Sequence, residues 1–202
     1  MGVYSTSGML EPTMTEWILH HIAEPTVRGM AEENTPFTGV LYCGLMMTAK
    51  GPQVLEYNAR FGDPETQAIL VRLESDLLDA LEACVDGNLS ETKMRWSDGA
   101  SACVVASSSG YPGSYTTGLP ISGLSNAALT PGVEVFHSGT TRIGSQVVTS
   151  GGRVLGVTAT GDSLEEALSH AYEGLAQIHF DGIYYRRDIG HRALKRTGSS
   201  RR

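Results

Sequence analysis

Apolar residues recur at three- and four-residue steps between Pro12 and Glu33, which is the spacing of a helix that buries one side. Pro25 falls inside this stretch and has no backbone N–H, so we expect a kink or break there. Asn34 follows the last periodic residue and is the expected stop. The positions that carry the pattern are Met14, Trp17, Ile18, His21, Ile22, Val27 and Met30.

Two strand-like segments follow this helix. Residues 38–48 and 53–61 are rich in β-formers, and the turn residues Ala49-Lys50-Gly51-Pro52 separate them. They predict an antiparallel hairpin. Asp63, Pro64 and Glu65 then fit the cap, first position and first turn of a second helix, expected to run through Cys84 and to end at Asp86-Gly87.

From about residue 100 the pattern becomes strand-rich. Expected strands cover 102–107, 133–137, 146–149 and 153–160, and Ser150-Gly151-Gly152 is predicted to be a hairpin turn between the last two. Asp162-Ser163-Leu164-Glu165 has the spacing of a capping box and opens a helix through Ile178. The pattern therefore predicts an α+β fold with a boundary between residues 88 and 100.

Composition narrows the class of protein. Of 202 residues, 41% are hydrophobic and 18% charged, which is typical of a globular protein, and the net charge of −7 argues against nucleic acid as a partner. No stretch approaches the ~20 apolar residues of a membrane span, and the N-terminus has no secretory pattern, so we expect no membrane association and a cytoplasmic location. Cys43, Cys84 and Cys103 predict buried free thiols. The basic segment 191–202 is expected to be a solvated, frayed terminus.

Three polar residues interrupt the second predicted strand at every second position. On a regular strand Val54, Glu56, Asn58 and Arg60 share one face, with steps of about 7 Å. A carboxylate beside an amide oxygen suits Mg²⁺, and an adjacent guanidinium suits a phosphate or carboxylate. The same alternation is also typical of an ordinary half-exposed strand with no site, and spacing alone favours that interpretation.

The residues around this strand resemble one family. The run VLEYNARFGDPETQAIL, with TPFTGVLYCGLMMTAKGP before it, is similar to the C-terminal half of the ATP-grasp domain of the phosphoribosylamine–glycine ligases (glycinamide ribonucleotide synthetases). MGVYS and PTVRGMAEE resemble earlier motifs of that family. SSSGYPGSYTTGLPISGL, VEVFHSGT, VVTSGGRVLGVTATG and IYYRRDIGHRAL resemble its C-terminal domain in order, so the resemblance covers residues 1–195.

The resemblance implies a fold and a reaction. It implies the C-terminal half of an ATP-grasp domain over residues 1–97, a small strand-rich domain with one long helix over 98–195, and a basic tail over 196–202. The implied enzyme is an ADP-forming carbon–nitrogen ligase of purine biosynthesis, which joins glycine to 5-phosphoribosylamine through a glycyl phosphate. Glu56 and Asn58 would hold the Mg²⁺ or Mn²⁺ that bridges the ATP phosphates, and Arg60 would face the phosphate or acyl phosphate.

The resemblance covers only part of an enzyme of that family. The family's N-terminal domain and nucleotide-binding lid have no counterpart here, so we expect a fragment that lacks turnover alone and has the missing N-terminal half as a partner. The alternatives are a non-catalytic binding module, or a subunit of another ATP-grasp ligase or carboxylase, which GYPGSY and VFHSGT disfavour.

His137 is a weaker candidate for a general base. Gly151-Gly152 resembles a phosphate loop only superficially, because no helix follows at once.

Overall fold

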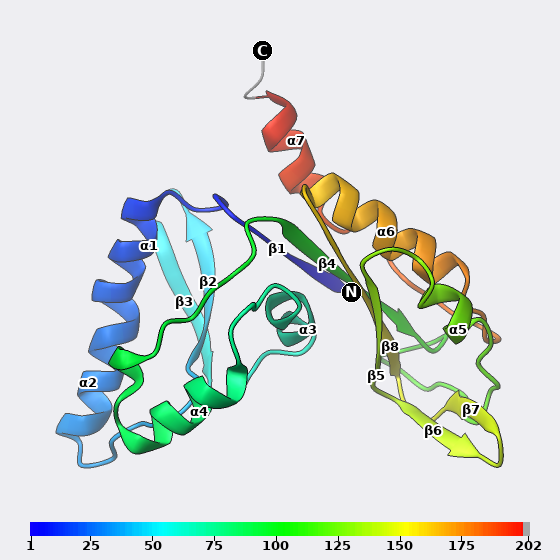
Figure 1. Cartoon of the computed structure of the whole chain (residues 1–202), viewed down its shortest axis with the longest axis horizontal. Coiled ribbons are helices and arrows are strands. Elements are labelled where there is room, and N and C mark those ends of the chain that lie inside the picture. Colours follow the sequence, from blue (N-terminus) through cyan, green and yellow to red (C-terminus); the bar gives the residue numbers. More distant parts are fainter. Residues whose placement is uncertain (200–202) are drawn as a thin grey trace. The chain divides into compact units, whose positions relative to one another are not determined.

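The computed structural model describes residues 1–199, which form two compact units (Figure 1). Unit 1 contains Met1–Ser7, Pro64–Arg72 and the chain from Ser97 onward, and unit 2 contains Gly8–Asp63 and Leu73–Trp96. The units interleave along the sequence, whereas the domains expected at 1–97 and 98–195 are continuous stretches. Those domain boundaries stay a prediction.

A four-stranded antiparallel sheet forms the centre of unit 1. Its strand order is β1 (Gly2–Thr6), β4 (Ala100–Ser107), β8 (Arg153–Gly161) and β5 (Val133–His137). Every residue of β4 is buried. A strand covered on both faces loses the polar alternation of a half-exposed one, which explains the run ASACVVAS.

Different helices cover the two faces of β4. On one face Ala102, Val104 and Ala106 belong to the apolar clusters that include the inner side of α6 (Leu164–Ala176). On the other face the Ser101 hydroxyl donates to the carbonyl of Ala68 in α3 (Glu65–Leu70). Residues two apart on a strand point to the same side, so this single strand is fixed between two layers. The largest fully buried side chains of unit 1 include Phe180, Leu155, Leu175 and Val157.

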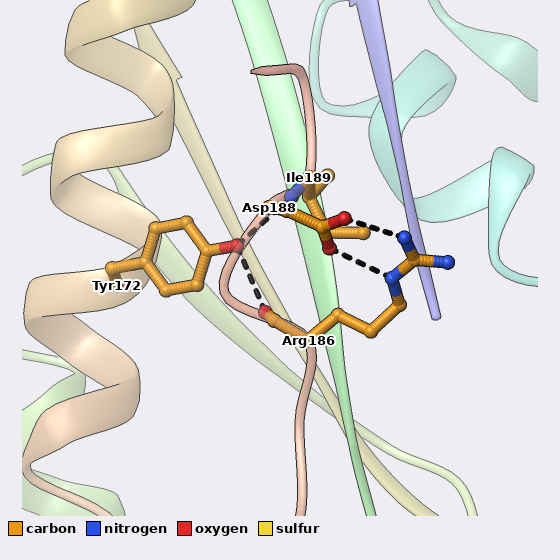
Figure 2. A network of polar contacts seen from close by, with 4 residues as sticks. All are labelled: Tyr172, Arg186, Asp188 and Ile189. Atoms are coloured by element: carbon orange, nitrogen blue, oxygen red, sulfur yellow. Dashed lines mark hydrogen bonds and ion pairs between the residues drawn. The ribbon is translucent and has the colours of Figure 1, made fainter. Parts of the chain in front are cut away.

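The segment after α6 is tied back to that helix by a polar network (Figure 2). The Tyr172 hydroxyl donates to the carbonyl of Arg186 at 2.9 Å and accepts from the backbone N–H of Ile189 at 3.2 Å. Arg186 and Asp188 form a two-pronged ion pair, with N–O distances of 2.8 and 2.6 Å. The short α5 (Leu124–Ala127) also contacts α6, and α7 (His191–Ser199) follows the network.

The expected hairpin turn at residues 150–152 is wrong. Strand β7 (Gln146–Thr149) pairs with β6 (Thr140–Ile143), whereas β8 pairs with β4 and β5. The N–H of Ser150 donates to the carbonyl of Gly139 at 2.7 Å. A Cβ on Gly139 would lie 2.6 Å from the Cα of Gly151, so two glycines let the backbones meet where the chain changes sheets.

Unit 2 begins with the expected helix. It consists of α1 (Pro12–Ile18), a π-helical turn η1 (Leu19–Ala23) and α2 (Glu24–Glu32). The distortion lies directly before Pro25, as expected from its missing N–H. Asn34 has a φ of 61°, and the N–H groups of Thr35 and Asn34 donate to the carbonyls of Met30 and Ala31. This is a Schellman ending, which confirms Asn34 as the stop.

The expected hairpin is also present in unit 2. Strands β2 (Tyr42–Thr48) and β3 (Gly51–Asn58) pair antiparallel. The single helix expected from Asp63 to Cys84 is wrong, because the structure has two helices there. Helix α3 ends first, a β-bridge joins Leu73 to Trp96, and α4 (Leu77–Asp86) begins only after it. Gly87, with a φ of 76°, ends α4 as expected, and the 3-10 turn η2 (Leu89–Glu91) follows.

Two helix caps differ from expectation by one residue. Helix α3 begins at Glu65, so Pro64 and not Asp63 takes the cap position. Helix α6 is capped by Ser163, whose hydroxyl accepts from the N–H of Glu166 at 3.2 Å, while the Glu166 carboxylate accepts from the N–H of Asp162 at 2.8 Å. The spacing of a capping box is present, but it is shifted one residue along the chain.

Three other expectations concern the surface and the thiols. The segment expected to fray is helical from His191 to Ser199, and residues 200–202 lie outside the described part. All three cysteines are free, as expected, although only Cys103 is fully buried. In the described residues no helix is both long and apolar enough to cross a membrane.

Candidate metal centre

Strand β3 brings the two predicted metal ligands together. The side-chain amide nitrogen of Asn58 donates to Oε1 of Glu56 at 3.2 Å. Glu56 is exposed and Asn58 is half-buried, so the pair is open to solvent from one side. The alternation of a strand accounts for this contact, because residues two apart project in the same direction.

A glycine makes room beside this pair. Gly44 of β2 lies opposite Glu56, and a Cβ on Gly44 would fall 3.0 Å from Cγ of Glu56. The Glu56 side chain therefore lies against bare backbone. Sequence reasoning missed this residue, although an isolated glycine inside a strand is a recognised signal of close approach or of a bulge.

The prediction that Val54 shares one face with Glu56, Asn58 and Arg60 is wrong at Val54. The register shifts between Gly44 and Leu45, so that Glu56 pairs with Gly44 and Val54 pairs with Leu45, leaving Leu55 as the extra residue of a bulge. Paired residues share a face, and Gly44 and Leu45 point to opposite faces. Val54 and Glu56 therefore face opposite ways.

Arg60 lies beyond the last residue of β3. Its Nη1 donates to the backbone carbonyl of Phe61 at 2.8 Å, and its side chain is exposed. In the described structure the guanidinium does not hydrogen-bond to Glu56 or Asn58. Because the strand ends at Asn58, alternation no longer places Arg60.

Helix α2 holds β3 at the position between the two predicted ligands. The hydroxyls of Thr26 and Tyr57 are 2.9 Å apart, and Thr26 Oγ1 is also 2.7 Å from the carbonyl of Ile22. Tyr57 is flanked by Glu56 and Asn58 in the sequence. This contact therefore fixes the strand where the pair projects from it.

Glu56 and Asn58 fit a divalent cation whose coordination shell is completed mostly by phosphate oxygens and water. Among the described residues no group of three or more His, Cys, Asp or Glu side chains could hold a metal. Mg²⁺ does not need such a cage, since it is usually bound through one or two protein carboxylates, phosphate oxygens and water. A half-turn of the Asn58 amide would present its oxygen beside the Glu56 carboxylate.

The weaker candidate His137 lies elsewhere, at the end of β5 in unit 1. Its Nδ1 is 2.9 Å from the hydroxyl of Thr140, so it stabilises the local turn into β6. Gly151 and Gly152 carry the chain between two sheets and precede β8 instead of a helix, which leaves them without the geometry of a phosphate loop.

Two family models match this chain. "Phosphoribosylglycinamide synthetase, ATP-grasp (A) domain" matches residues 1–66, and "Phosphoribosylglycinamide synthetase, C domain" matches residues 101–192. The chain belongs to the phosphoribosylglycinamide synthetase family. Glu56 and Asn58 lie inside the segment matched by the ATP-grasp model. The family expected from the sequence is confirmed.

Relatives and solved structures agree with this family. The chain is 48% identical over 200 residues to a phosphoribosylamine–glycine ligase of Mesorhizobium japonicum, covering 99% of this chain and 47% of that protein. The crystal structure of the phosphoribosylamine–glycine ligase of Thermotoga maritima matches with a TM-score of 0.79 and 33% identity, over 94% of this chain and 46% of that one.

A more distant structure shows the fold alone. The N5-carboxyaminoimidazole ribonucleotide synthetase of Thermotoga maritima matches with a TM-score of 0.58 and 15% identity, over 85% of this chain and 43% of that one. The α+β, ATP-grasp-like fold is therefore confirmed. The chain spans just under half the length of the curated relatives that it matches.

Proposed function

We propose that this chain supplies the metal-binding strand and the C-terminal part of a phosphoribosylamine–glycine ligase. The observation that carries the proposal is the contact between Glu56 and Asn58 inside the segment matched by an ATP-grasp model of that family. Both side chains carry hard oxygen atoms and lie on a strand anchored by Tyr57. The three free cysteines are compatible with the reducing cytoplasm, where we place the reaction.

The proposed reaction has two steps. A glycine carboxylate oxygen attacks the γ-phosphorus of ATP, the bond to the ADP oxygen breaks, and glycyl phosphate forms. The amine nitrogen of 5-phosphoribosylamine then attacks the acyl carbon, phosphate leaves with the bonding electrons, and the amine loses a proton to give the amide of glycinamide ribonucleotide. Such a reaction is accelerated chiefly by positioning and by charge neutralisation.

Three residues of this chain would contribute to that charge neutralisation. Glu56 and Asn58 would hold Mg²⁺ or Mn²⁺, which when bound supplies positive charge against the ATP phosphates. Arg60 would place a further positive charge near the transferred phosphoryl group or the acyl phosphate. Its position after the strand and its exposed side chain leave it free to turn toward a bound anion.

We further propose that turnover needs a polypeptide equivalent to the other half of the relatives. The support is the length comparison together with the uncovered apolar side chains of the β2–β3 hairpin, among which Met46 is 52% and Leu55 is 64% exposed. These same observations favour the second candidate, a binding module that has no activity of its own. The 202-residue chain alone is then expected to form no ADP.

A chimera tests the ligase assignment. Residues 1–202 replace the matching portion of the Mesorhizobium japonicum ligase, and ADP formation is measured with ATP, glycine and 5-phosphoribosylamine. We expect ADP formation that depends on both co-substrates. A folded chimera without activity, beside an active parent, would contradict the ligase function and favour the binding module. Glycine-dependent ADP formation by the 202-residue chain alone would contradict the need for a second half.

The same chimera tests the metal ligands. Glu56→Gln and Asn58→Ala are compared with Glu74→Gln, which alters an exposed carboxylate of unit 2 outside the hairpin. We expect the Mg²⁺ concentration that gives half of the maximal rate to rise at least about tenfold for the first two, a loss of about 1.4 kcal/mol, and to stay unchanged for the third. An unchanged Mg²⁺ concentration for half of the maximal rate in Glu56→Gln would contradict the metal assignment.

A further inference from the structure

Arg72 is a buried charged side chain just after α3, with only 8% of its surface exposed. Its Nη1 donates to the hydroxyl of Ser5 at 2.7 Å, and its Nη2 donates to the hydroxyl of Ser7 at 3.0 Å and to the carbonyl of Ser97 at 2.8 Å. In the described structure none of these partners is a carboxylate, and its Nε has no partner. A buried cation with only neutral acceptors is costly, so these contacts need a reason beyond packing.

Further hydrogen bonds join the same segments. The N–H of Ser97 donates to the carbonyl of Arg72 at 2.8 Å, so side chain and backbone of Arg72 both bind one residue. The hydroxyl of Ser7 donates to the carbonyl of Asp98 at 3.2 Å. Three segments far apart in the sequence are therefore linked pairwise around one guanidinium.

The residues of this cluster lie where the chain leaves or re-enters unit 1. Ser7 and Arg72 are the last residues of two segments of unit 1, and Ser97 is the first residue of its third segment. The chain therefore leaves unit 1 after Ser7, leaves it again after Arg72, and returns at Ser97. The remaining passage, from Asp63 to Pro64, lies at the start of α3, the helix that ends two residues before Arg72.

We infer that Arg72 is a clamp that fixes three of the four points where the chain passes between unit 1 and unit 2. The planar guanidinium fork reaches three acceptors at once, which a lysine cannot reproduce with the same geometry. Both segments of unit 2 thus begin directly after a point that is fixed on unit 1, and the second segment also returns to such a point. The inference concerns the fold and does not rest on the proposed ligase function.

Hydrogen exchange of the full chain, followed by mass spectrometry, tests the clamp. Arg72→Met removes all three side-chain hydrogen bonds and is compared with Arg95→Met, which alters an exposed arginine close to the same passage. We expect amides of residues 1–7 and 97–100 to exchange at least about tenfold faster in Arg72→Met, since hydrogen bonds to a charged group are lost. Amides of α6 and β5 should keep their rates, and Arg95→Met should match the parent chain.

Ser7→Ala supplies a second test that does not depend on Arg72→Met folding. It removes one acceptor of Arg72 and the donor to the Asp98 carbonyl without burying a new group, so we expect a rise of about threefold to tenfold at the same two segments. Acceleration spread evenly over unit 1, including α6 and β5, would overturn the clamp, because Arg72 would then support general stability only. Unchanged exchange in residues 1–7 and 97–100 would overturn it as well.

Discussion

The sheets of the two units differ in how much of them is covered. In unit 1, Leu155 and Val157 of β8 have no exposed surface, because helices and neighbouring strands enclose them. In unit 2, the hairpin is well paired, yet Leu55 is 64% exposed and Tyr57, on the same strand, is 42% exposed. Local sequence is enough to pair two strands, whereas burying them needs further elements. An isolated two-stranded sheet is marginally stable, so unit 2 should be the weaker unit.

The largest expected effect on stability comes from leucine-to-alanine substitutions, whose cost should differ between the two units. Leu155→Ala removes a fully buried side chain and should cost about 2–5 kcal/mol, whereas Leu55→Ala removes an exposed one and should change stability by less than about 0.5 kcal/mol. Urea unfolding measures both values. Equal losses from the two substitutions would show that Leu55 is covered in solution and would break the comparison.

The positions of the tryptophans sharpen this measurement. Both tryptophans, Trp17 and Trp96, belong to unit 2, so their fluorescence reports on that unit while circular dichroism reports on both. We expect the fluorescence transition to come at lower urea, and Leu155→Ala to move mainly the later, dichroism-detected transition. Coincident transitions that move together would mean that the units unfold as one cooperative body.

A smaller effect comes from two helix caps of the same kind. Ser163 caps α6 in unit 1, and Asp76 caps α4 in unit 2 by accepting from the N–H of Leu78 at 2.8 Å. Replacing either by alanine should cost about 1 kcal/mol. The loss from Asp76→Ala should appear in the fluorescence transition and the loss from Ser163→Ala in the later one. The opposite assignment would contradict the division into units.

The smallest effect is a pH dependence that arises from one ion pair of unit 1. The hydrogen bonds from Arg186 hold the pKa of Asp188 below its ordinary value of 3.8 (Figure 2). A lowered pKa in the folded state means that the stabilisation is present above 3.8 and is lost as the pH falls through the lower, folded-state pKa. The pair is exposed, so the effect should be slight.

Urea midpoints at neutral and at acid pH measure this dependence. Asp188→Asn should be less stable than the parent chain near neutral pH, and the difference should shrink below the ordinary carboxyl pKa. Arg186→Gln serves as the partner control and should remove the same pH dependence. A difference that grows on acidification would refute the assignment.

Much of the candidate site could be predicted from the sequence because its geometry is local. Glu56 and Asn58 are two residues apart on a strand, and alternation alone places their side chains together. The bulge at Leu55 and the end of the strand at Asn58 depend on pairing with β2, so alternation misplaced Val54 and does not place Arg60, whose role stays a prediction. Gly44 was visible in the sequence as an isolated glycine in a strand, but its place opposite Glu56 could be found only once the register was known.

The sequence by itself determined the family, the α+β class, the hairpin, the helix stops at Asn34 and Gly87, and the contact between Glu56 and Asn58, because each follows from residues close together in the chain. Tertiary structure alone decided which strands pair across long separations, such as β7 with β6 instead of β8. It also decided that Arg72 joins Ser5, Ser7 and Ser97. Such contacts need loops to close and layers to pack, and neither is encoded in the period of a single segment.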